Sequence, residues 1–137
     1  MNALVVDASV TAKCVLPESG SRHAANLIAT ALRLLAPEIM VSESANAIWK
    51  SVHRRSMSQP DALDALGTLL TIPVWTLPLE PLTPLAFDLA LRYDHPIYDC
   101  YYLAAAIASD CPLATADKRL HDLARRAGLG ERAILIT

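Results

Sequence analysis

The chain has 137 residues, of which 53% are hydrophobic and 19% are charged, and its formal net charge is -2. This composition excludes an intrinsically disordered chain, and the length predicts a single domain over residues 1–137 with a core of its own. The small negative charge excludes an overall basic field that would attract nucleic acid, so any such contact depends on a local patch.

The three cysteines, Cys14, Cys100 and Cys111, are widely spaced and odd in number. They fit free thiols in a reducing compartment and lack the close spacing of a zinc site. Asp7 interrupts the first apolar run, so no signal peptide is predicted. The longest uncharged run, 65–79, is shorter than a membrane span of about 20 residues. We therefore predict a cytoplasmic protein that does not enter a membrane.

Apolar runs and turn residues divide the chain into strands and helices. The predicted elements are, in order, a strand (3–6), a short helix within 7–16, three helices (22–35, 38–55, 58–70), a strand (72–77), two helices (85–93, 98–109), a strand (112–115), a helix (117–127) and a strand (132–136). Pro37 is expected in the first turn of the second helix of the group of three, and Thr83-Pro84 at the start of the helix over 85–93. Strands that alternate with helices predict a parallel sheet between two helical layers.

The helix over 38–55 has an apolar face that is expected to be buried. Its residues are Ile39, Val41, Ala45, Ile48, Trp49 and Val52. Three helices between the first two strands are unusual for a simple doubly wound fold.

Most of the fourteen acidic residues are explained by helix starts, ion pairs or loops. Four are explained less well. Asp7 ends the first strand, Glu43 lies one turn into an apolar helix, Asp99 opens a helix rich in alanine, and Asp117 follows the strand over 112–115. The alternatives stay open for each: a turn residue at Asp7, a helix start at Asp99 and Asp117, and a solvated surface at Glu43.

These carboxylates could meet at one end of the sheet. Asp7 and Asp117 directly follow strands, which places them at the carboxyl edge, where ligands bind in such folds. Crowded carboxylates repel one another and lose hydration, and a divalent cation that prefers oxygen ligands resolves the conflict. The pattern therefore predicts a site for Mg²⁺ or Mn²⁺.

Four segments of the chain resemble PIN-domain ribonucleases, and within that family the VapC-type toxins of bacterial toxin–antitoxin pairs. They are Leu4-Val5-Val6-Asp7-Ala8-Ser9-Val10, Ala36-Pro37 with Glu43-Ser44-Ala45-Asn46-Ala47, Tyr98-Asp99-Cys100-Tyr101-Tyr102-Leu103-Ala104, and Leu113-Ala114-Thr115-Ala116-Asp117-Lys118-Arg119-Leu120. The segments follow the family's order over nearly the whole chain, but Ser44 replaces the usual apolar residue. The resemblance implies a three-layer α/β/α PIN-like fold with a central, mainly parallel sheet of four to five short strands.

The resemblance also implies an endoribonuclease that uses Mg²⁺ or Mn²⁺ and in which a metal-activated water attacks the RNA phosphodiester. The residues implied as catalytic and metal-binding are Asp7, Glu43, Asp99 and Asp117. The residues expected to support them are Ser9, Asn46 and Thr115, for which a turn, a helix face and a strand end are the open alternatives. The four histidines are expected to be surface residues rather than catalysts.

RNA binding would need a local cationic surface. Lys13, Lys50 and Arg54 are the candidates, although basic residues also favour helix ends and solvent. Trp49 and Tyr102 are expected to pack in the core rather than to stack on bases. The family implies two protein partners, a cognate antitoxin and a second copy in a homodimer.

Three other functions stay open. One is a PIN nuclease of RNA maturation, and another is a catalytically inactive PIN-like module that binds RNA or protein. A phosphotransfer domain fits poorly, because Asp7-Ala8-Ser9 lacks a second aspartate.

Overall fold

The computed structural model describes residues 2–31 and 33–137 and contains a five-stranded sheet in the order β3-β2-β1-β4-β5. The strands are β1 (Ala3–Val6), β2 (Arg33–Pro37), β3 (Val74–Leu77), β4 (Leu113–Thr115) and β5 (Ala133–Leu135). Each neighbouring pair is parallel, so the carboxyl ends of all five strands lie at one edge of the sheet.

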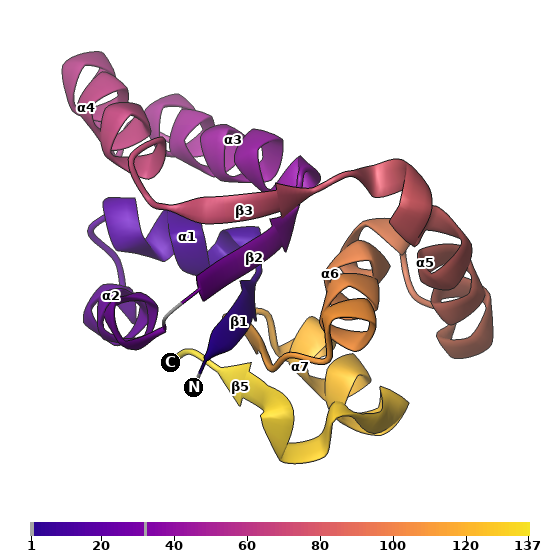
Figure 1. The fold of residues 1–137 in the computed structure, drawn as a ribbon. Helices are drawn as coiled ribbons and strands as arrows, with labels where there is room; N and C mark the ends of the chain where they lie inside the picture. The colour runs from indigo at the N-terminus through magenta and orange to yellow at the C-terminus, as the bar shows by residue number, and fades with distance from the viewer. Residues whose placement is uncertain (1, 32) are drawn as a thin grey trace.

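Helices cover both faces of this sheet, as Figure 1 shows: α1, α3 and α4 lie on one face, and α5, α6 and α7 lie on the other. The helices are α1 (Ala8–Val15), α2 (Ser21–Thr30), α3 (Ile39–His53), α4 (Gln59–Leu69), α5 (Leu79–Tyr93), α6 (Ile97–Ser109) and α7 (Lys118–Ala124). This arrangement confirms the predicted three-layer α/β/α fold. Within the described residues, no helix has the length and apolar character needed to cross a membrane.

Strand β2 corrects the prediction for residues 33–37, which were assigned to the end of one helix and the start of the next. Leucine and alanine favour helix, and they continue the helical spacing of the preceding residues. In the fold, Leu34 and Leu35 are buried, and β2 pairs with β1 on one side and with β3 on the other. Pro37 ends this strand and is not in a helix. The first two strands, β1 and β2, are therefore separated by α1 and α2, whereas the prediction placed a short helix and three longer helices between the first two strands.

The helices of the second half also differ from prediction at their ends. Helix α5 begins at Leu79, and Pro84 lies inside it, so Thr83-Pro84 do not start the helix. Asp88 and Arg92 form an ion pair on its surface at 3.0 Å. After α7 the chain continues through a π-helical turn (Arg125–Leu129) and a 3₁₀ turn (Gly130–Arg132).

The buried face of α3 is narrower than the apolar pattern predicts. Met40, Ser44 and Ile48 are buried at a spacing of four residues, whereas 57% of Trp49 and 37% of Val41 is exposed. The prediction of a buried Trp49 is therefore wrong. Its ring stacks on His53, with 5.0 Å between the ring centroids, and lines an open apolar groove between α3 and α4.

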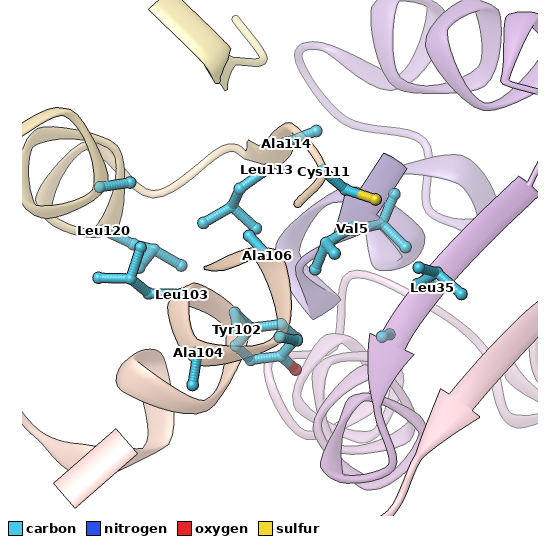
Figure 2. Close-up of a cluster of buried hydrophobic side chains, with 14 of the residues drawn as sticks. Val5, Leu35, Tyr102, Leu103, Ala104, Ala106, Cys111, Leu113, Ala114 and Leu120 are labelled. Carbon is cyan, nitrogen blue, oxygen red and sulfur yellow. The ribbon is translucent and has the colours of Figure 1, made fainter. Parts of the chain in front are cut away.

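The main core lies between the sheet and α6. Leu4, Val5 and Val6 are fully buried, so β1 is covered on both faces. Figure 2 shows Val5, Leu35 and Leu113 together with residues of α6, among them Tyr102. The core thus fixes both β1, which directly precedes Asp7, and α6, whose first turn contains Asp99.

Candidate active site at the carboxyl edge of the sheet

Asp7 directly follows β1, and only 6% of it is exposed. Its Oδ2 accepts hydrogen bonds from the hydroxyls of Ser9 at 2.6 Å and Thr115 at 2.8 Å. The pKa of Asp7 is raised to about 6, and burial is the largest cause. The two hydroxyl bonds oppose this rise in pKa, and the charges of Asp99 and Glu43 add to it. The Asp7 side chain does not cap α1. Asp7 occupies the N-cap position of α1, but its carboxylate bonds Ser9 and Thr115 instead of capping the helix.

Ser9 and Thr115 connect the start of α1 to the loop after β4. Their hydroxyl oxygens lie 3.3 Å apart. The backbone N–H of Ala116 donates to Ser9, and that of Asp117 donates to Thr115, at 2.9 and 3.0 Å. Both hydroxyls thus bond the carboxylate of Asp7 and also hold the loop that carries Asp117.

Glu43 lies on the first turns of α3 and is half-buried. Its Oε1 accepts a hydrogen bond from the hydroxyl of Tyr102, a fully buried residue of α6. Burial raises the pKa of Glu43; the bond from Tyr102 opposes this effect, and the charge of Asp99 adds to it. Tyr102 packs in the core as predicted, but its hydrogen bond to Glu43 was not foreseen. The sequence contains one indication that Tyr102 lies near the carboxylates: it follows Asp99 by three residues and so lies on the same side of the helix.

Asp99 lies in the first turn of α6, and its Oδ2 is 2.8 Å from Nε2 of His95. Only 8% of the His95 side chain is exposed, against 29% of the Asp99 side chain. The prediction that all histidines are surface residues is therefore wrong for His95. The missed sign is the spacing of four residues between a histidine and a carboxylate where a helix begins.

Asp117 caps α7, because its Oδ1 accepts a hydrogen bond from the backbone N–H of Arg119 at 2.8 Å. The capping alternative therefore describes its local structure. Through Thr115, which bonds both the Asp117 N–H and the Asp7 carboxylate, the residue remains joined to the acidic group.

Two neighbours of Glu43 differ from expectation. Asn46 is exposed and has no side-chain hydrogen bond to Glu43 within the described residues, so no such bond supports its expected role. Ser44 is buried, and its hydroxyl lies 2.7 Å from that of Thr11 on α1. This bond accounts for a polar residue where the family usually has an apolar one, since it satisfies both buried hydroxyls.

Three carboxylates therefore come together from three elements: Asp7 after β1, Glu43 on α3 and Asp99 on α6. The charges of Asp99 and Glu43 raise the pKa of Asp7, and the charge of Asp99 raises the pKa of Glu43. Their oxygens are the donors that Mg²⁺ and Mn²⁺ prefer. As the side chains stand, no three acidic, histidine or cysteine groups among the described residues are close enough to hold one ion. Mg²⁺ commonly binds through one or two carboxylates and keeps its waters, so this donor set fits it.

The predicted RNA-binding residues also come together. Lys13, Lys50 and Arg54 line one open cavity of about 370 Å³ beside the acidic group, with Ser9 and Asp117 at its border. The sequence indicated each residue separately, and the packing of α1 against α3 brings them to one place.

Comparison with known proteins shows the family to which the chain is similar. The family model described as "PIN domain" matches residues 4–126. Ribonuclease VapC3 of Pyrobaculum aerophilum is 31% identical over 85% of this chain and 91% of its own length. Ribonuclease VapC9 of Mycobacterium tuberculosis is 34% identical over 87% of this chain and 89% of its own length.

The fold has a solved counterpart. The crystal structure of PAE2754 from Pyrobaculum aerophilum superimposes with a TM-score of 0.71, covering 89% of this chain and 79% of that chain. The sequence identity is 23%, so this likeness concerns the fold alone.

Proposed function

We propose that this chain, which belongs to the PIN domain family and within it to the VapC type, is a metal-dependent endoribonuclease and the toxin of a toxin–antitoxin pair. The observation that carries the proposal is the meeting of Asp7, Glu43 and Asp99 at the carboxyl edge of the sheet. The relatives VapC3 and VapC9 are named ribonucleases, which supports RNA as the substrate.

The chain's own residues would prepare this site in a defined way. Ser9 and Thr115 hold one oxygen of Asp7, and within the described residues no hydrogen bond occupies its Oδ1. The backbone fixes Asp7 rigidly, because its N–H donates to the carbonyl of Ala114 in β4. Tyr102 holds one oxygen of Glu43, and His95 holds one oxygen of Asp99. Each carboxylate is thus oriented while one oxygen stays available.

Mg²⁺ or Mn²⁺ would be held by Asp7 and Asp99, with Glu43 and Asp117 nearby. When bound, such an ion stabilises charge that develops on the phosphate and lowers the pKa of water. Glu43, whose pKa is raised by burial, would orient or deprotonate the attacking water. Within the described residues, all buried polar side-chain atoms have hydrogen-bond partners.

The two alternatives within the family differ in substrate or activity. A nuclease of RNA maturation would use the same carboxylates, so the site does not separate it from a toxin. An inactive binding module would not need a carboxylate buried at an energetic cost, and the raised pKa of Asp7 is such a cost. This observation favours an active enzyme.

Sequencing of RNA ends after induced expression tests the proposal. The wild-type chain should produce defined cleavage ends and arrest growth, and Asp99→Asn should abolish both while it folds normally. Asp88→Asn is the matched control, because Asp88 is an exposed carboxylate on α5 paired with Arg92. Equal cleavage by the wild type and Asp99→Asn would reject the proposed site.

We also propose the two protein partners that the family implies. An antitoxin would cover apolar surface, and the groove between α3 and α4 exposes Trp49 and Leu63 at 57% and 70%. Coexpression with the antitoxin, sought as a small reading frame adjacent to the gene, should yield a stable complex that lacks ribonuclease activity. Light scattering of the purified chain measures the proposed homodimer directly, and a monomer at all concentrations would exclude it.

A further inference from the structure

The cavity lined by Lys13, Lys50 and Arg54 lies beside the carboxylates but is not part of them. Ser9 and Asp117 border it at one end, and the three cations lie farther along α1 and α3. The cavity measures about 370 Å³ and is open to solvent. Its position and charge suggest a ligand that extends from the catalytic centre.

The positive residues share a helix face with the catalytic glutamate. Glu43 and Lys50 on α3 and Arg54 at its C-cap are separated by seven and four residues, so they lie on one side of the helix. The rise of about 1.5 Å per residue puts Lys50 roughly 10 Å from Glu43 along the helix axis. On α1, Lys13 follows Ser9 by one turn in the same way.

The charges of the three cations are not equally available. Lys13 donates to the carboxylate of Glu18 at 3.3 Å and to the carbonyl of Ser19 at 2.7 Å. An ammonium has three donors, so one remains. Lys50 and Arg54 are exposed and belong to none of the ion pairs found within the described residues. Their charge is therefore available to a ligand.

We propose that this cavity is a phosphate subsite that binds the backbone of single-stranded RNA a few nucleotides from the cleaved bond. The proposal rests on the proposed ribonuclease function and adds where the strand runs. The distance of roughly 10 Å between Glu43 and Lys50 along α3 separates this subsite from the cleaved phosphate itself. The strand would pass from the carboxylates along the groove between α1 and α3.

An acidic protein segment is the competing ligand, and the geometry favours RNA. The cavity is continuous with Ser9 and Asp117 of the catalytic edge and contains hydroxyl groups as well as cations. The larger apolar surface lies elsewhere, in the groove between α3 and α4.

The test measures binding separately from cleavage. The probe is a fluorescein-labelled ten-nucleotide RNA of mixed sequence, and every protein carries Asp99→Asn and is kept in EDTA so that the probe stays intact. Fluorescence anisotropy gives the affinity at increasing salt. Lys50→Gln with Arg54→Gln should weaken binding and reduce the slope of log K against log salt by about 1.4, because each phosphate contact on a single strand contributes about 0.7.

The matched control removes two exposed cations elsewhere, Arg33→Gln at the start of β2 with Arg125→Gln after α7. It has the same net charge change and should leave the slope almost unchanged. Equal slopes for both double variants, or no binding of RNA by any of them, would overturn the subsite. If the double variant at Lys50 and Arg54 lost binding only to a labelled hexaglutamate peptide and not to RNA, the RNA subsite would be overturned in favour of an acidic protein ligand. The expected slope change in this background, together with a chain that never cleaves RNA when Asp99 is retained and Mg²⁺ or Mn²⁺ is supplied, would instead contradict the proposed function alone.

Discussion

The hydroxyl of Tyr102 donates a hydrogen bond to Oε1 of Glu43 and thereby joins α6 to α3 across the catalytic edge. Tyr102 is fully buried, so its position is set by the core rather than by solvent. The bond favours the charged form of Glu43 against the burial that raises the pKa of that residue. The core therefore controls the ionisation of a proposed catalytic group.

Replacement of this hydroxyl should impair catalysis more than folding. A hydrogen bond to a charged group contributes roughly 1.5–3 kcal/mol, so Tyr102→Phe should lower kcat about tenfold or more with little change in KM. Because the bond lowers the pKa of Glu43, its loss should raise that pKa, and the acidic limb of the pH–rate profile should move to higher pH. Steady-state cleavage of a defined RNA from pH 5 to 9 measures both effects.

Tyr101→Phe provides the matched control on the same helix. Its hydroxyl lies 2.7 Å from that of Thr83 on α5, away from the carboxylates. This variant loses an equivalent group and should keep the wild-type pH profile. If both variants show the same profile, Tyr102 has only a structural role.

Asp7 should make the folded chain less stable at neutral pH. The pKa of Asp7 is about 6 in the folded chain and 3.8 in the reference state, so the folded state binds more protons between these values. Stability should therefore fall as pH rises through this window, by about 3 kcal/mol in total. Asp7→Asn should stabilise the chain by up to that amount at pH 7.5 and hardly at all below pH 4. Urea unfolding at both pH values, without divalent cations, gives the difference.

Asp88→Asn serves as the control for this measurement, because Asp88 is exposed and ion-paired at the surface. Its effect should be small and nearly independent of pH. A stability gain for Asp7→Asn that is the same at both pH values would show that the ionised carboxylate is not the cause.

A divalent cation should reverse this destabilisation. Binding requires ionised carboxylates, so it competes with protons for Asp7. Mn²⁺ or Mg²⁺ should raise Tm by a larger amount at pH 7.5 than at pH 5.5, below the pKa of about 6. The shift should be lost in Asp7→Asn and in the presence of EDTA. Differential scanning fluorimetry across a metal titration provides the measurement, and an equal shift in Asp7→Asn would place the ion elsewhere.

Local patterns predicted the strands that are uniformly apolar but not the one that also favours helix. Leu4, Val5 and Val6 are strongly suited to a buried strand, and β1 was found at the predicted residues. Leu34, Leu35 and Ala36 are compatible with either structure, and pairing with both β1 and β3 decides for strand. That information lies in residues distant in sequence, so no local window contains it.

The same distinction applies to the site. Asp7, Glu43 and Asp99 could be selected because each lies near the end of a strand or the beginning of a helix. Tyr102, which holds Glu43, could not, because it also suits ordinary packing and its role depends on how α6 lies relative to α3. His95 was indicated only by its spacing of four residues from Asp99, a local contact at the start of α6.

His95 should act as a positioning residue for Asp99. Its Nε2 lies 2.8 Å from Oδ2 of Asp99, and its side chain is mostly buried, so the ring has little freedom to move. His95→Ala should release Asp99 to other rotamers, lower kcat about tenfold and weaken the Mn²⁺-dependent rise in Tm, because supporting hydrogen bonds typically contribute 10–100-fold to metal affinity or activity. His95→Gln, which retains a donor, should recover part of both losses. His121→Ala is the matched control, since that ring contacts the Ala133 carbonyl outside the site. Equal losses of kcat and metal response in His95→Ala and His121→Ala would mean that a general loss of packing, rather than the orientation of Asp99, explains the effect.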